Sequence, residues 1–145
     1  MSDTGLEVFD TTIHKTHVWL NDIKRQLDVD DTHAAYRALR IVLHTLRDRL
    51  TVDEAVKLGA QLPMLVRGMY FEGWRPAGKP DKSIDRDELL GRIADAFTNH
   101  GFNNPHHIVQ AVLHTIDLHL SSGETDKIWS CLPKSMRELW PEPVG

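Results

Sequence analysis

Histidines are the side chains of this sequence with the most versatile chemistry, because imidazole binds metals and exchanges protons near neutral pH. The chain of 145 residues contains nine of them. Asp10, His14 and His17 follow one another at helical spacing and fall within about 60° of each other on a helical wheel. A carboxylate and two imidazoles on one helix face could hold a divalent metal ion. The same face lies about 110° from the apolar side of the expected helix, so a solvated polar face is the simpler interpretation.

His44 and His114 occupy corresponding positions of an internal repeat, which is described below. As a related pair, they could bind a ligand between the two halves, with Asp117 orienting the His114 ring. The interpretation that we favour is a half-buried packing role for both rings.

Three arginines, Arg37, Arg40 and Arg47, share a helix face with His44. Such a face could contact an acidic partner or phosphate groups. The corresponding face of the second copy lacks this charge, so a solvated helix face is the favoured interpretation.

Large aromatic side chains gather near the short helices of both copies: Tyr70, Phe71, Trp74, Trp129 and Trp140. If they stay exposed, they would form an interface with a partner. The alternative is that they fix the short helices on the long ones. Glu72 stands beside Gly73-Trp74, so Tyr70, Glu72 and Trp74 join His44 and His114 as candidate binding residues.

Signatures of known catalytic sites are absent from the sequence. The single cysteine, Cys131, has no basic neighbours that would favour a thiolate, and it cannot form an intrachain disulfide. There is no Gly-x-Ser-x-Gly, no phosphate-binding glycine loop and no His-Glu-x-x-His. We therefore expect no catalytic residue and no cofactor, and the sequence favours a protein that is not an enzyme.

The charge is slightly acidic and evenly distributed. The net charge is −4, and residues 1–74 and 75–145 each contribute −2. Without a basic segment, a nucleic-acid-binding surface is not indicated. No apolar run resembles a signal peptide or spans the 18 residues typical of a membrane helix, so we expect a cytoplasmic protein without a membrane partner.

Apolar spacing predicts helices throughout the chain. Residues 4–27 are expected to form the first, with a capping box of Thr4 and Glu7 at its start. Its apolar face should be formed by residues at alternating spacings of three and four, namely Leu6, Phe9, Ile13, Thr16, Leu20, Ile23 and Leu27.

A second long helix is expected from Asp31 or Thr32 to Leu50, followed by two short helices. The first short helix should start at a Thr51/Glu54 capping box and the second at Pro63. The prolines and glycine of residues 75–83 predict a linker.

The remaining residues repeat this order. One helix is expected from Asp85 to Gly101, with a core face of Leu89, Leu90, Ile93, Ala94 and Phe97. Another should run from Asn104-Pro105 to Leu120, and two short helices should cover residues 122–130 and 133–140.

The internal repeat is the strongest signal in the sequence. Residues 39–70 align without a gap with residues 109–140, and ten of the 32 positions are identical. Unrelated sequences of ordinary composition would share roughly two. Each copy is predicted to contain two long helices followed by two short ones.

The repeated Leu-Pro helix starts, the segment Tyr70-Phe71-Glu72-Gly73-Trp74-Arg75-Pro76 and the Ser122-Gly123-Glu124 turn resemble the prokaryotic domain of unknown function 2267 family. The resemblance covers roughly residues 6–140 and is most specific around Gly73-Trp74. It implies an α-helical prokaryotic protein, and it implies no activity and no catalytic residues.

Together these features predict an all-α protein of about eight helices. A first repeat (1–74), a linker (75–83) and a second repeat (84–145) would pack as one domain. We expect a non-catalytic helical interaction or regulatory module that self-associates. Its partner should be a second copy, in a homodimer, or another protein. The alternative is a protein that binds a metal or small ligand through histidines at the repeat seam or on the first helix.

Overall fold

The computed structural model describes residues 3–98 and 104–140, and these residues form eight α-helices and no strand. The first four are α1 (Glu7–Leu27), α2 (Thr32–Arg49), α3 (Val52–Ala60) and α4 (Met64–Phe71). The others are α5 (Arg86–Ala96), α6 (Pro105–His119), α7 (Ser122–Ser130) and α8 (Lys134–Arg137). The all-α prediction is therefore confirmed.

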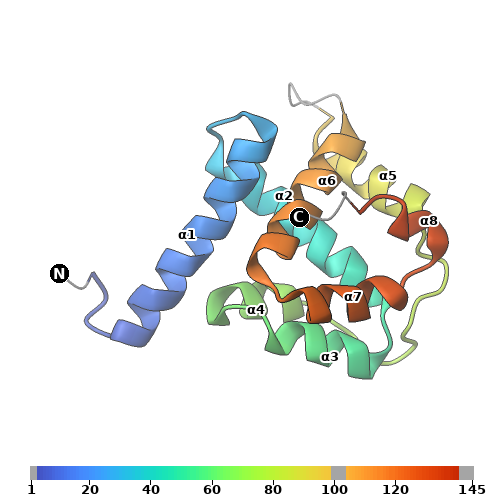
Figure 1. Cartoon of the computed structure of the whole chain (residues 1–145), viewed down its shortest axis with the longest axis horizontal. Helices are drawn as coiled ribbons and strands as arrows, with labels where there is room; N and C mark the ends of the chain where they lie inside the picture. The colour runs from blue at the N-terminus through green and yellow to red at the C-terminus, as the bar shows by residue number, and fades with distance from the viewer. Residues whose placement is uncertain (1–2, 99–103, 141–145) are drawn as a thin grey trace.

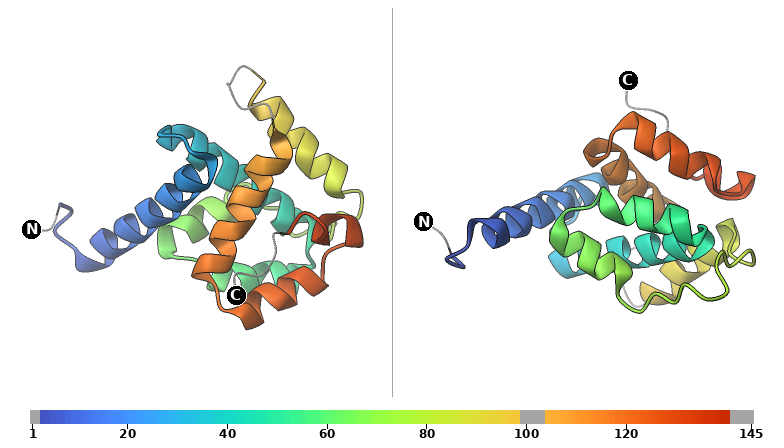
Figure 2. Two further views of the ribbon diagram at one scale, coloured as in Figure 1. Left: turned by 45° about the horizontal axis from the view of Figure 1, so that its top comes forward. Right: turned by 90° about the horizontal axis from the view of Figure 1, so that it is seen from below.

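The centre of the fold is formed by α2 and α6, which contact each other and both pack against α1 and α5. The helix α4 covers α1 and α2, while α3 contacts α4 and α7. The first half of α1 projects away from this body, as the views in Figures 1 and 2 show. No helix among the described residues is long and apolar enough to cross a membrane.

Hydroxyl, carboxylate and amide side chains begin most of the helices as the sequence predicts. Asp31 accepts a hydrogen bond from the Ala34 amide at 3.0 Å, and Thr51 with Glu54 forms a capping box. Asp85, Asn104 and Ser121 cap α5, α6 and α7 in the same manner. These side chains satisfy backbone N–H groups that have no partner within the helix.

The predicted capping box at Thr4 is wrong. The helix α1 begins at Glu7, and its N-cap residue is Leu6, whose side chain makes no capping bond. Gly5 has a φ of 80°, which turns the backbone out of the helical path before Thr4 can cap it. The Thr4 hydroxyl instead donates to the Asp10 carboxylate at 2.8 Å.

The prediction for α5 is partly wrong. Its helix ends at Ala96, before the predicted stop at Gly101, which lies outside the described residues. Leu89, Ile93 and Phe97 are buried and Leu90 packs half-buried against the core, but Ala94 is exposed.

The helix boundaries of the second copy recur at the offset of the sequence repeat. Val52–Ala60 and Ser122–Ser130 are 70 positions apart, and so are the starts of α4 and α8. Thr51 and Ser121 are the N-caps of α3 and α7, and Pro63 and Pro133 those of α4 and α8. Superposition of the two copies in space and the predicted domain boundaries stay predictions.

Candidate interaction surface

The apolar face of α1 is buried along its second half and exposed along its first. Leu20 and Ile23 are 6% and 0% exposed, because α2 and α6 cover them. Leu6, Phe9 and Ile13 continue the same spacing, yet they are 52%, 45% and 38% exposed. The expectation that the whole face packs in the core is therefore wrong for its first three positions.

A groove of about 660 Å³ runs beside this exposed face, between α1 and α4. We call it the α1/α4 groove. Its lining is mainly apolar and is shared by α1, α2 and α4, including Phe9, Ile13, Leu39, Met64, Leu65 and Met69. Met64 and Leu65 are 48% and 49% exposed, so large apolar side chains stand on both walls. Neighbouring exposed apolar residues of this kind mark interaction sites more often than isolated ones do.

The α1 wall of the groove is joined to α4 by Thr12. Its hydroxyl oxygen accepts a hydrogen bond from the Leu65 amide at 2.9 Å, and the residue is buried. This amide belongs to the first turn of α4, where backbone donors lack partners within the helix. Thr12 therefore supplies the side-chain capping contact that Pro63, the N-cap residue, cannot make.

The other end of α4 is held by basic side chains of α2. Arg47 is buried and donates to the Tyr70 and Glu72 carbonyl oxygens at 2.8 and 3.0 Å. His44 Nε2 lies 2.7 Å from the Met69 carbonyl oxygen, so this nitrogen carries the proton and donates. Positive groups and donors at a helix C-terminus satisfy its free carbonyls and complement its dipole. The predicted solvated face is wrong for Arg47.

Two other arginines of the same α2 face, Arg40 and Arg37, also contact groups at the ends of other helices. Arg40 forms an ion pair of 2.7 Å with the exposed Glu72 carboxylate, and that pairing holds the pKa of Glu72 below its usual range. Arg37 donates to the Ala96 carbonyl oxygen at the end of α5 and stacks over the Phe97 ring. The sequence showed the shared face, but the helix ends that it contacts became visible only with the fold.

Burial shifts the pKa values of both His44 and Tyr70. Burial between α2 and α4 lowers the pKa of His44, although its hydrogen bond to the Met69 carbonyl acts in the opposite direction. Tyr70 is fully buried, burial raises the pKa of its phenol well above the ordinary value, and its hydroxyl donates to the Ala55 carbonyl oxygen at 2.7 Å. Both side chains hold α4 in place.

The two remaining predicted binding residues are Trp74 and His114. Trp74 is half-buried against Phe71, and its ring nitrogen has no hydrogen-bond partner among the described residues. His114 is half-buried on α6, and the neighbouring Asp117 accepts from the Trp140 indole at 2.8 Å. Glu72 alone of the five lines the α1/α4 groove.

The predicted metal residues lie on the projecting part of α1. His14 and His17 are exposed, and the Asp10 carboxylate accepts hydrogen bonds from the Thr4 amide and hydroxyl. Within residues 3–98 and 104–140, no group of three or more His, Cys, Asp or Glu side chains is arranged to hold a metal ion.

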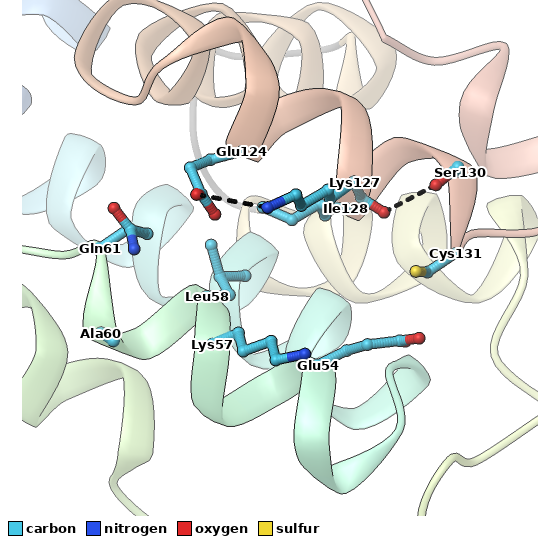
Figure 3. Close-up of a pocket in the computed structure, with 10 residues that line it drawn as sticks. All are labelled: Glu54, Lys57, Leu58, Ala60, Gln61, Glu124, Lys127, Ile128, Ser130 and Cys131. Carbon is cyan, nitrogen blue, oxygen red and sulfur yellow. Dashed lines mark hydrogen bonds and ion pairs between the residues drawn. The ribbon is translucent and has the colours of Figure 1, made fainter.

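A second, smaller hollow of about 420 Å³ lies between α3 and α7 (Figure 3). We call it the α3/α7 pocket. The helices run in opposite directions, so Gln61 lies near Glu124 and Cys131 near Glu54. Its ten lining residues form five pairs at the repeat offset: Glu54 and Glu124, Lys57 and Lys127, Leu58 and Ile128, Ala60 and Ser130, Gln61 and Cys131.

The α3/α7 pocket is lined by four charged side chains and by the apolar side chains of Leu58 and Ile128. Lys57 pairs with Asp53 at 3.0 Å and Lys127 lies 3.9 Å from Glu124, so both ammonium groups have carboxylate partners. Burial and the nearby Glu54 carboxylate raise the pKa of the Cys131 thiol. A thiol of this kind is a poor nucleophile at neutral pH. No histidine lines this pocket.

Comparison with known protein families identifies a match over most of the chain. The sequence pattern of the family described as "Uncharacterized conserved protein (DUF2267)" matches residues 16–139. No curated protein matches the chain. The matched range begins at Thr16, so the exposed part of α1 precedes it.

Proposed function

The chain belongs to the DUF2267 family of uncharacterized conserved proteins, and on this premise we propose that it is a non-catalytic helical interaction module that self-associates through the α1/α4 groove. The observation that carries the proposal is the continuous apolar face of α1. Its second half is covered by the protein's own core, and its first half has the same residue types, whose side chains are 38–52% exposed.

The physical argument is the cost of leaving this face in water. Burial of apolar surface contributes about 25 cal/mol per Å², so covering several large side chains favours association. The groove offers a concave site between helices, the shape into which an amphipathic helix docks. Polar contacts at both ends of α4 fix one wall, so little ordering is required when a partner binds.

Light scattering on purified protein tests the proposal. We expect the wild type to have twice the chain mass of 16.5 kDa, whereas Ile13→Glu should have the mass of one chain. Lys15→Glu is the matched control, because Lys15 is exposed and does not line the α1/α4 groove. It introduces a carboxylate two residues away and should remain dimeric. A monomeric wild type at high concentration would contradict the proposal.

Small-ligand binding in the α3/α7 pocket is a second candidate function, and the five repeat-related pairs of lining residues favour it. A ligand suited to this lining has an apolar centre above Leu58 and Ile128 and two cationic ends near Glu54 and Glu124, as in a linear diamine. Isothermal titration with a diamine of four or five carbons tests this idea, with Ala60→Trp as the variant that fills the pocket. Equal heats from the two proteins would contradict it.

A further inference from the structure

We infer that the α3/α7 pocket recognises a linear primary amine by a single ammonium group, which binds at Glu54, while the group at the other end of the ligand adds little. This inference rests on the second candidate function, ligand binding in this pocket, and it names the residue that selects the ligand and the orientation of the bound molecule. The observation that carries it is a difference in ion pairing between the two repeat-related halves of the pocket.

The two glutamates of the pocket are equivalent by sequence. Glu54 and Glu124 are both half-buried in the lining, and each is the third residue of its helix. Each follows a capping hydroxyl by three positions, Thr51 in α3 and Ser121 in α7. From the repeat alone, the two ends of the pocket should attract a cation equally.

The lysines that accompany the two glutamates have different partners. Lys57 Nζ lies 3.0 Å from the carboxylate of Asp53, four residues earlier in α3, and Asp53 does not line the pocket. The corresponding residue of α7 is Gly123, which offers no carboxylate, and Lys127 lies 3.9 Å from Glu124 instead (Figure 3). The ammonium group of Lys57 is therefore engaged outside the lining, whereas that of Lys127 partly neutralises the glutamate beside it.

Glu54 is left as the carboxylate that a ligand can use. It accepts a hydrogen bond from the Thr51 backbone amide at 3.4 Å, and within residues 3–98 and 104–140 no lysine or arginine forms an ion pair with it. The four charged lining residues together with Asp53 give three carboxylates and two ammonium groups, a net charge of −1. The pocket therefore complements one positive charge, and charge complementarity of this kind selects a partner.

The rest of the lining accounts for the rest of the ligand. Leu58 and Ile128 are buried and would contact a short methylene chain. Beyond them Gln61 lies near Glu124 (Figure 3), and its side-chain amide can both donate and accept hydrogen bonds. A hydroxyl suits this end about as well as an ammonium group does, because the Glu124 carboxylate already has Lys127 as its partner.

Isothermal titration with three ligands of equal length tests the inference. 5-Aminopentanol should bind the wild type with an affinity within about three-fold of that of 1,5-diaminopentane, and uncharged 1,5-pentanediol should bind at least about ten-fold more weakly. Absence of binding by the diamine would contradict the candidate function itself and the inference with it. A diamine that binds while the amino alcohol behaves like the diol would overturn only the inference.

Glutamine substitutions compare the two ends directly. Glutamine keeps the length of the side chain and completes a capping box as glutamate does, so both helices should keep their starts. The affinity for 1,5-diaminopentane should fall about ten-fold or more in Glu54→Gln and less than about three-fold in Glu124→Gln. Equal losses in the two variants would overturn the assignment of the ammonium group to Glu54.

The sharpest test changes the residue that differs between the copies, which does not line the pocket. Gly123→Asp should give Lys127 a partner four residues earlier and so release Glu124. A Cβ atom at position 123 meets no atom within 4 Å, so the variant should fold. The affinity for the diamine should rise several-fold. That for 5-aminopentanol should rise by at most about two-fold, because its single ammonium group gains only a second, equivalent orientation.

The reciprocal variant is Asp53→Ala. It should free Lys57 to pair with Glu54, three residues earlier, and so lower the affinity for both amines several-fold. Position 53 is exposed and lies outside the lining, so a purely structural role for Asp53 predicts no such loss. Amine affinities that stay at the wild-type values in both Gly123→Asp and Asp53→Ala would overturn the inference.

Discussion

The two halves of α1 have the same alternation of apolar residues and meet opposite environments. Trp19 and Ile23 are buried by α2 and α6, whereas Phe9 and Ile13 stand 45% and 38% exposed beside the α1/α4 groove. The difference teaches that helical apolar spacing indicates that a face will be covered, without indicating which chain covers it. In the second half the covering surface is the protein's own core. In the first half we propose that it is a second copy.

The largest expected effect is on the free energy of unfolding, which substitutions in the two halves of α1 should change by different amounts. Ile23→Ala should lower the free energy of unfolding by about 2–5 kcal/mol, because it leaves a cavity in a close-packed core. Ile13→Ala should change the stability of the monomer by less than about 0.5 kcal/mol, as exposed positions do. Urea unfolding followed by circular dichroism at low protein concentration measures both. Equal losses in the two variants would show that the halves do not differ.

The next largest effect concerns α4, which forms one wall of the α1/α4 groove. Arg47→Ala should destabilise the protein by about 3 kcal/mol, because it leaves two carbonyl oxygens and the Asp48 carboxylate without their donor. Arg25→Ala is the control, since Arg25 is exposed and forms an ion pair with Asp22 of the same helix. Thermal unfolding should show a clear loss for Arg47→Ala and almost none for Arg25→Ala.

A smaller effect concerns association alone. Phe9→Ala should raise the dimer dissociation constant by roughly 10- to 100-fold, the change produced by truncating an aromatic side chain at the centre of an interface. Val8→Ala is the matched control, because Val8 is 51% exposed but does not line the α1/α4 groove. Sedimentation equilibrium measures the two constants. A similar rise for both variants would show that general hydrophobicity, and not the groove, drives association.

The smallest effect is a dependence on pH through His44. Since burial lowers its pKa in the folded protein, the unfolded chain takes up a proton more readily as the pH falls below the ordinary value of about 6.5. The neutral ring therefore contributes stability above that pH, and the contribution is lost on acidification. His44→Gln should show a shallower loss between pH 7 and 5 in urea unfolding. An identical loss in both proteins would contradict this role.

Much of the fold was predictable because local signals decide it. The caps at Asp31, Thr51 and Asn104 follow from hydroxyl, carboxylate and amide chemistry at helix starts, and the short helices follow from the repeat. The cap at Thr4 failed because one glycine, Gly5, redirects the backbone. Asp117 accepts a hydrogen bond from the Trp140 indole, and only tertiary packing brings these two residues together.

The candidate site was harder to predict for a related physical reason. Phe9, Ile13, Met64 and Leu65 are apolar residues of the kind that form a core, yet they are 38–49% exposed in the structure. Arg47 shows the reverse, because a charged side chain expected on a solvated helix face is buried and holds the end of α4. The exposure of each side chain depends on how the helices pack, and it cannot be read from the apolar pattern of the sequence alone.

Hydrogen exchange along α1, measured at several protein concentrations, tests the central claim most directly. We predict that the backbone amides of residues 10–15 become more protected as the concentration rises through the dimer dissociation constant. The amides of residues 19–27 should be equally protected throughout, because the chain's own core covers them. Protection of residues 10–15 that does not change with concentration would contradict the proposal that a second copy covers the first half of α1.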